Sequence, residues 1–107
     1  MTEERISYDE TMSILLQIIS GELEIRCKPG YCWADAEAIC CFVAGDYEIS
    51  FFRDAGVLDY LDWIEHVDGR FSDCDFYIDG RVVCPIEDGL TDEQEKQLDR
   101  KLHESGS

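Results

Sequence analysis

The chain of 107 residues is short of positive charge: 9 Lys and Arg stand against 25 Asp and Glu, a formal net charge of −16. Binding to nucleic acid or to an anionic membrane depends largely on cations that contact phosphates. The shortage therefore argues against direct nucleic-acid binding and against membrane binding. The same charge attracts basic protein surfaces and accelerates association with them at low salt.

Long apolar runs are also lacking, and the longest is far too short to cross a bilayer. The first ten residues, MTEERISYDE, are acidic and contain no apolar stretch of the secretory type. We therefore expect a cytoplasmic protein whose cysteines are free thiols in a reducing compartment. There are six of them: Cys27, Cys32, Cys40, Cys41, Cys74 and Cys84.

Signatures of catalysis and nucleotide binding are missing. The sequence contains no C-x-x-C, G-x-S-x-G, P-loop or G-x-G-x-x-G. His66 and His103 are the only histidines, and no cysteine is visibly matched to either. Pairs of carboxylates arise by chance among 25 acidic residues, so they do not single out a hydrolytic site. We expect a protein that is not an enzyme.

The spacing of cysteines gives little support to a zinc site. Four residues separate Cys27 from Cys32 across Pro29-Gly30, which is a plausible knuckle, but Cys74 and Cys84 are nine residues apart and supply no second pair. A structural zinc ion needs four ligands at fixed geometry. Buried thiols that pack in the core are the better explanation.

The residues that follow Asp75 do not match the ligand positions of a calcium-binding EF-hand loop. If Asp75 opens an EF-hand loop, Tyr77 stands at position 3 and Ile86 at position 12, where the loop needs oxygen ligands. Glu87 comes one residue too late for the bidentate role. We therefore expect no cofactor and no metal.

The N-terminal part carries the clearest helix signal. Ser7 and Glu10 have the S-x-x-E spacing of a capping box, and apolar residues follow at steps of three and four. Gly21 can take the positive φ that ends a helix. The pattern predicts a helix over residues 8–20 with a wide apolar face that lies across a sheet.

A second capping box, Thr91 with Gln94, predicts a last helix after Pro85. Acidic residues occupy its first turn, as the helix dipole prefers. Leu98 and Leu102 are its only apolar side chains, so we expect it to dock lightly.

Alternating polar and apolar residues between turn signals predict an antiparallel meander of four or five strands. The expected strands are 22–28, 36–44, 47–53 and 57–67, with a short hairpin at 75–78 and 81–83. The stretch 57–67 is ambiguous, because Leu58, Leu61 and Ile64 would also line one face of a helix. The Asp68-Gly69 turn favours a strand. The expected fold class is α+β, in one domain over 1–107 with 1–6 and 104–107 flexible.

Carboxylates concentrate between residues 54 and 79, where Arg70 is the one cation. On one face of a strand, side chains recur about 7 Å apart, close to the phosphate spacing of one DNA strand. Such a row could occupy a groove built for a nucleic-acid backbone, with aromatic side chains as apolar anchors. The alternative is an ordinary solvated sheet face. The predicted partner-binding residues are Asp54, Asp59, Tyr60, Asp62, Trp63, Glu65, Asp68, Asp73 and Asp75.

The same region resembles an uncharacterised family of short bacterial proteins of pseudomonad type, through Phe51-Phe52-x-Asp54, Leu58-Asp59-Tyr60 and Asp68-Gly69-Arg70. The likeness extends loosely over residues 10–103. Leu61 and Ile64 stand where that family commonly has cysteines, which argues against a metal or disulfide role there. The resemblance implies a fold and no activity.

These observations favour a non-enzymatic acidic protein that binds a basic, nucleic-acid-binding surface of a partner, as anti-CRISPR inhibitors from phages do by mimicking nucleic acid. That comparison rests on size and charge alone. An immunity protein that neutralises a basic toxin nuclease needs the same electrostatics. Another class is a housekeeping domain that binds a ligand or metal, with charge serving only solubility, and the last is an enzyme of unrecognised type.

Overall fold

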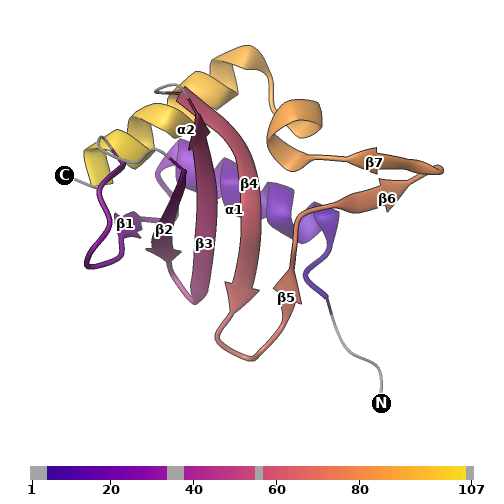
Figure 1. Cartoon of the computed structure of the whole chain (residues 1–107), viewed down its shortest axis with the longest axis horizontal. Coiled ribbons are helices and arrows are strands. Elements are labelled where there is room, and N and C mark those ends of the chain that lie inside the picture. The colour runs from indigo at the N-terminus through magenta and orange to yellow at the C-terminus, as the bar shows by residue number, and fades with distance from the viewer. Residues whose placement is uncertain (1–4, 34–37, 55–56, 106–107) are drawn as a thin grey trace.

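The computed structural model describes residues 5–33, 38–54 and 57–105. In this part of the chain, two helices lie on one side of a five-stranded antiparallel sheet (Figure 1). The predicted α+β fold, with a helix at each end of a meander, is confirmed. No described helix is long and apolar enough to cross a membrane.

The strands of the sheet follow one another in chain order, so each neighbouring pair is antiparallel. A two-stranded hairpin and a π-helical turn separate the sheet from the last helix, and the hairpin projects away from the body of the protein (Figure 1). The strands are β1 (Ile25–Cys27), β2 (Ile39–Ala44), β3 (Tyr47–Asp54), β4 (Val57–His66) and β5 (Phe71–Ser72), then β6 (Phe76–Ile78) and β7 (Arg81–Val83), followed by the turn η2 (Pro85–Gly89).

The first helix, α1 (Tyr8–Ser20), has the predicted bounds. The Glu10 backbone N–H donates to Ser7 Oγ at 3.0 Å, and Gly21 closes the helix at φ +90°. The Glu10 side chain does not complete the capping box in the usual way. Its carboxylate accepts hydrogen bonds from Tyr47 and Arg70, so it ties the helix to the sheet instead.

The last helix, α2 (Asp92–Ser105), begins with a complete capping box. The Thr91 N–H donates to Gln94 Oε1 at 2.9 Å, and the Gln94 N–H donates to Thr91 Oγ1 at 3.1 Å. Leu98 and Leu102 are both fully buried. The Trp33 indole adds a polar contact to these two leucines, because it donates a hydrogen bond to this helix.

Trp33, just after the Pro29-Gly30 break, folds back onto the core and is fully buried. Its ring packs edge-on against Phe42 and Phe51, with centroids 5.8 and 6.3 Å away. Its Nε1–H donates to Asp99 Oδ1 of α2 at 2.9 Å. One side chain thus joins the β1–β2 connection, the sheet and the last helix.

The strand β4 confirms the sheet assignment of residues 57–66, and it also explains their helix-like spacing. The register with β3 shifts twice, which leaves Asp59 and Asp62 without a partner residue on β3. Each shift adds one residue to β4, as a β-bulge does. Leu58, Leu61 and Ile64 are therefore buried together although they are three residues apart.

Arg5 and Ile6 belong to the segment 1–6 that the sequence predicts to be flexible, and in the structure both make contacts with the rest of the fold. Ile6 is fully buried, and Arg5 forms a parallel bridge with Phe71. The Arg5 guanidinium also bonds Asp73 at 2.8 Å. Residues 1–4 lie outside the described part, as do residues 36–37 of the second predicted strand and residues 106–107 of the predicted flexible end; α2 itself reaches Ser105.

All six cysteines are free thiols in this structure. Cys40 faces the helices and Cys41 the other side of the sheet, and both are buried. Cys27 Sγ and Cys40 Sγ are 3.6 Å apart, which is not a disulfide distance. Burial raises the pKa of the Cys40 and Cys74 thiols to about 12.

Candidate functional site: an acidic cleft beside the fourth strand

A cleft of about 340 Å³ opens beside the first half of β4. The strand β5 pairs only with Ile64 and Glu65, so the earlier residues of β4 border open space on that side within the described chain. The connection from β5 to β6 and the turn η2 form the other walls. The cleft is lined by five carboxylates, namely Asp59, Asp62, Asp73, Asp75 and Glu87, together with Tyr60, Leu61, Cys74 and Cys84.

Two local features bring these carboxylates together. The bulges of β4 carry Asp59 and Asp62 at its first and second register shifts. On the opposite wall, Asp73 Oδ1 accepts from the Asp75 N–H at 3.2 Å, and Cys74 between them adopts φ +64° and is buried. This tight turn keeps both Asp73 and Asp75 exposed at the cleft.

The electrostatic field of the cleft is negative. Partial desolvation raises the pKa of the Tyr60 hydroxyl, and the nearby charges of Asp62 and Asp59 raise it further. Burial raises the pKa of the Cys84 thiol, with Glu87 adding to the effect. Neither group becomes an activated nucleophile, because a raised pKa keeps it protonated at neutral pH.

The negative region continues onto α2. Burial raises the pKa of Glu95, and the charges of Asp92, Glu87 and Asp59 raise it further, so the helix and the cleft share one field. A second hollow of about 270 Å³ lies there, lined by Leu58, Asp92, Glu95, Lys96 and Asp99. We call the combined surface the acidic flank: Asp59, Asp62, Asp73, Asp75, Glu87, Asp92, Glu95 and Asp99.

The structure brings five of the nine predicted binding residues together in the cleft: Asp59, Tyr60, Asp62, Asp73 and Asp75. The other four lie elsewhere. Asp54 ends β3, Trp63 and Glu65 lie on the sheet face that the helices leave open, and Asp68 lies in the β4–β5 turn. An evenly spaced row of carboxylates does not form, because the two bulges interrupt the alternation of β4.

Two of the predicted carboxylates are already paired within the chain. The backbone N–H of Arg70 lowers the pKa of Asp68 to about 2, and the Arg70 side chain adds to this through its Nε, which bonds Asp68 at 2.9 Å. Arg5 bonds Asp73 at 2.8 Å on the rim of the cleft. A partner would meet less free charge at these two positions than the sequence alone suggests.

The sequence interpretation missed the half of the acidic flank that comes from the C-terminal part of the chain. Glu87, Asp92, Glu95 and Asp99 lie far from β4 in sequence, and Asp92 was interpreted as a favourable first-turn residue and as an i,i+4 partner of Lys96. No local pattern signals their proximity to β4. The packing of η2 and α2 against this strand creates it.

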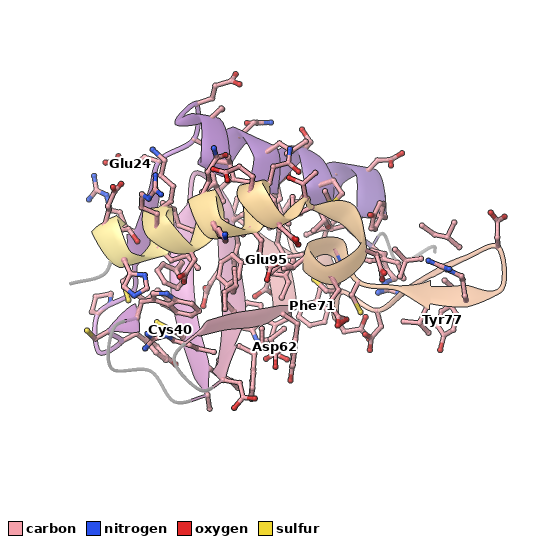
Figure 2. The ribbon with its side chains drawn as sticks, turned by 90° about the horizontal axis from the view of Figure 1, so that it is seen from above. Glu24, Cys40, Asp62, Phe71, Tyr77 and Glu95 are labelled. Atoms are coloured by element: carbon pink, nitrogen blue, oxygen red, sulfur yellow. The ribbon has the colours of Figure 1, made fainter. Side chains whose placement is uncertain are left out.

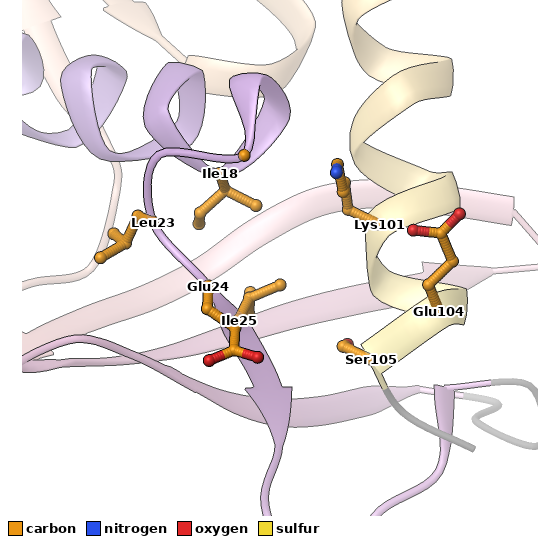
Figure 3. Close-up of a pocket in the computed structure, with 8 residues that line it drawn as sticks. Ile18, Leu23, Glu24, Ile25, Lys101, Glu104 and Ser105 are labelled. Atoms are coloured by element: carbon orange, nitrogen blue, oxygen red, sulfur yellow. The ribbon is translucent and has the colours of Figure 1, made fainter.

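A hollow of about 400 Å³ lies at the opposite end of α2, between the end of α1 and the first strand (Figure 3). Ile18 and Ile25 give it an apolar floor, and Lys101 and Glu104 come from α2. It contains none of the predicted binding residues. Within the described part of the chain, no three His, Cys, Asp or Glu side chains are placed to hold a metal ion.

The fold and the cleft define a small two-layer α+β domain with one strongly acidic side. The chain belongs to the family described as Domain of unknown function (DUF7693), whose model matches residues 5–104. Membership of an uncharacterised family, which the resemblance implies, is thereby confirmed. No curated protein and no solved structure gives a significant match.

Proposed function

We propose that this protein is a non-enzymatic binding protein that uses its acidic flank to dock on a basic surface of another protein, one that otherwise binds nucleic acid. The supporting observation is the convergence of five carboxylates on one cleft with no Lys or Arg among the residues that line it. Dispersed acidic residues would serve solubility equally well. Gathering them from three separate segments creates a local potential that a dispersed charge does not.

The contacts that such a partner would make follow from the geometry of the cleft. Asp59 and Asp62 on one wall face Asp75 and Glu87 on the others, so a guanidinium could reach carboxylates from two sides. The half-exposed ring of Tyr60 lies among them and offers a face for cation–π contact. Arginine satisfies both requirements better than lysine, because its planar fork pairs with carboxylates and stacks on rings.

The resemblance to short pseudomonad proteins would place this partner in a bacterial cytoplasm, where basic nucleases and defence proteins act on nucleic acid. An inhibitor of such a defence protein and an immunity protein against a toxin nuclease use the same electrostatics. They differ in the partner alone. The identity of the captured protein therefore decides between them.

The proposal is tested by immobilising this protein and identifying the partner protein that it retains. Wild type is compared with a variant in which four cleft residues are neutralised: Asp59→Asn, Asp62→Asn, Asp75→Asn and Glu87→Gln. A matched control neutralises four carboxylates outside the flank: Glu22→Gln, Glu24→Gln, Asp46→Asn and Glu104→Gln. Both variants lose the same formal charge, so any difference between them reports position and not net charge.

We expect wild type and the control variant to retain the same basic protein, and the cleft variant to lose it. With the purified pair, affinity should fall steeply as salt rises, and duplex DNA should compete for the partner. Equal binding by the cleft variant and the control would refute a role for the cleft. Binding that DNA leaves unaffected would refute the idea that the partner's nucleic-acid surface is the one covered.

A further inference from the structure

The sheet face that the helices leave open is unusually apolar. Both helices lie on one side of the sheet, and no other described helix or strand covers its second side (Figure 2). In antiparallel sheets with one solvated face, residues normally alternate between apolar inward and polar outward positions. Here the outward positions carry large apolar side chains as well: Ile39, Val43, Phe52, Tyr60, Trp63 and Phe71.

These side chains form connected rows across the strands. Ile39, Phe52 and Tyr60 are in register on three neighbouring strands, and the last two rings stack at 4.7 Å. Trp63 stacks on Phe71 of the edge strand at 6.2 Å. Ile39, Tyr60 and Phe71 remain substantially exposed. A connected apolar surface of this kind marks an interaction site more often than scattered residues do.

The charges on this face differ from those of the rest of the protein. The row that crosses all five strands is Arg26, Val43, Glu48, Glu65 and Phe71. Lys28 also reaches this face and bonds Glu48 at 2.7 Å. Arg26 and Lys28 thus offset part of the negative charge of Glu24, Glu48, Asp54 and Glu65, in a chain whose net charge is −16. A basic partner would be drawn to the acidic flank and not to this face.

The distribution of these charges suits a second copy of the chain. Arg26 and Lys28 belong to the β1 side of the face, Arg26 in a loose 3.6 Å pair with Glu24, and Glu65 belongs to the β4 side. A twofold axis parallel to the strands would place the β1 side of one copy over the β4 side of the other. Opposite charges would then face each other around an apolar centre.

The available area is that of a small, weakly held dimer. The five strands contain 3, 6, 8, 10 and 2 residues, so at the usual strand spacing and rise they offer about 470 Å² of face per copy. Stable interfaces bury about 600 Å² or more on each side, and smaller contacts of this kind are weak. We propose that two copies of this protein pack face to face through this surface, as two sheets pack in a β-sandwich.

Salt separates this contact from the one proposed for the acidic flank. Two chains that each carry −16 repel each other at long range, and salt screens that repulsion more than it weakens the few opposite charges that face each other, while it leaves apolar contacts in place. The dimer should therefore become tighter as salt rises. The complex with a basic partner should become weaker, so either proposal can fail without the other.

Sedimentation velocity of the full chain, at concentrations up to about 100 μM, tests the dimer. The principal variant is Val43→Glu, which adds a charge to this face on β2. The matched control is Leu16→Glu on α1, because Leu16 and Val43 are each 40% exposed but belong to opposite layers. Circular dichroism checks that each variant folds, and Ile39→Glu is a second variant on the face should Val43→Glu unfold.

We expect wild type and Leu16→Glu to dimerise, and Val43→Glu to raise the dissociation constant at least about tenfold, because an unpaired charge is costly in an apolar interface. Adding salt should lower the wild-type dissociation constant. A wild-type chain that stays monomeric throughout would overturn the proposal. So would a loss of dimer in Leu16→Glu equal to that in Val43→Glu, or a dimer that dissociates as salt rises.

Discussion

The contact between Trp33 and Asp99 gives the sharpest test of how this domain holds its last helix. Replacing Trp33 with Phe keeps an aromatic ring in the core but removes the indole N–H that donates to Asp99 at 2.9 Å. It also leaves space beside Phe42 and Phe51, the two rings that now pack against the indole. The variant Asp99→Ala removes the acceptor and leaves the buried indole N–H without its partner.

The expected cost of Trp33→Phe is about 3 kcal/mol. A hydrogen bond to a carboxylate contributes about 1.5–3 kcal/mol, and the lower end applies because the Asp99 side chain is 30% exposed. The space left by the smaller ring adds about 1–2 kcal/mol. The free energy of unfolding of small domains is only about 5–15 kcal/mol, so this loss is a large part of the total stability. It corresponds to a fall in melting temperature of about 12 °C.

Urea unfolding followed by circular dichroism measures wild type, both single variants and the double variant at neutral pH. The double-mutant cycle should give a coupling free energy of about 1.5 kcal/mol between Trp33 and Asp99, since the second substitution finds the bond already lost. A coupling below about 0.5 kcal/mol would refute the role assigned to this bond. In that case Trp33 would act through packing alone.

Three further predictions concern other contacts. Arg70 and Tyr47 lower the pKa of Glu10 through hydrogen bonds, so this carboxylate stabilises the fold above the unfolded pKa of about 4.3 and loses that effect as pH falls through its folded pKa. The melting temperature should therefore fall less steeply from pH 6 to pH 3 in Glu10→Gln than in wild type, and parallel curves would contradict this. Cys40 and Cys74, whose pKa burial raises to about 12, should react with Ellman's reagent at pH 8 only after denaturation, and fast labelling of either in the native protein would rule out the burial described. Thr91→Ala should cost about 1 kcal/mol of unfolding free energy because it removes one bond of the α2 capping box, and a variant as stable as wild type in urea would show that this cap contributes nothing.

The helices and the antiparallel meander could be predicted from the sequence because their signals are local. The capping residues Ser7 and Thr91 and the terminating Gly21 specify helix ends through bonds to backbone groups a few residues away. Turn residues between alternating strands then allow little besides a meander. The large excess of carboxylates follows from composition alone and does not depend on the fold.

The candidate site depended on the tertiary structure. The bulges at Asp59 and Asp62 arise from the pairing of β4 with β3, and no residue type in β4 specifies where the register shifts. Glu87 reaches the cleft because η2 packs against β4, a contact between segments that 18 residues separate along the chain. Sequence reasoning found part of the acidic surface because those residues are close along the chain, and it missed the rest because distance in space is set by packing.

For the open face of the sheet, too, one part could be predicted from the sequence and another part depended on the packing of the elements. The sequence by itself determined that this chain is acidic, that it forms an α+β meander and that aromatic residues stand among the carboxylates of its second half. Only the tertiary structure decided that both helices lie on the same side of the sheet, which leaves Phe52, Tyr60, Trp63 and Phe71 uncovered. The physical reason is that a strand pattern assigns residues to two faces, whereas the packing of other elements determines which face is covered.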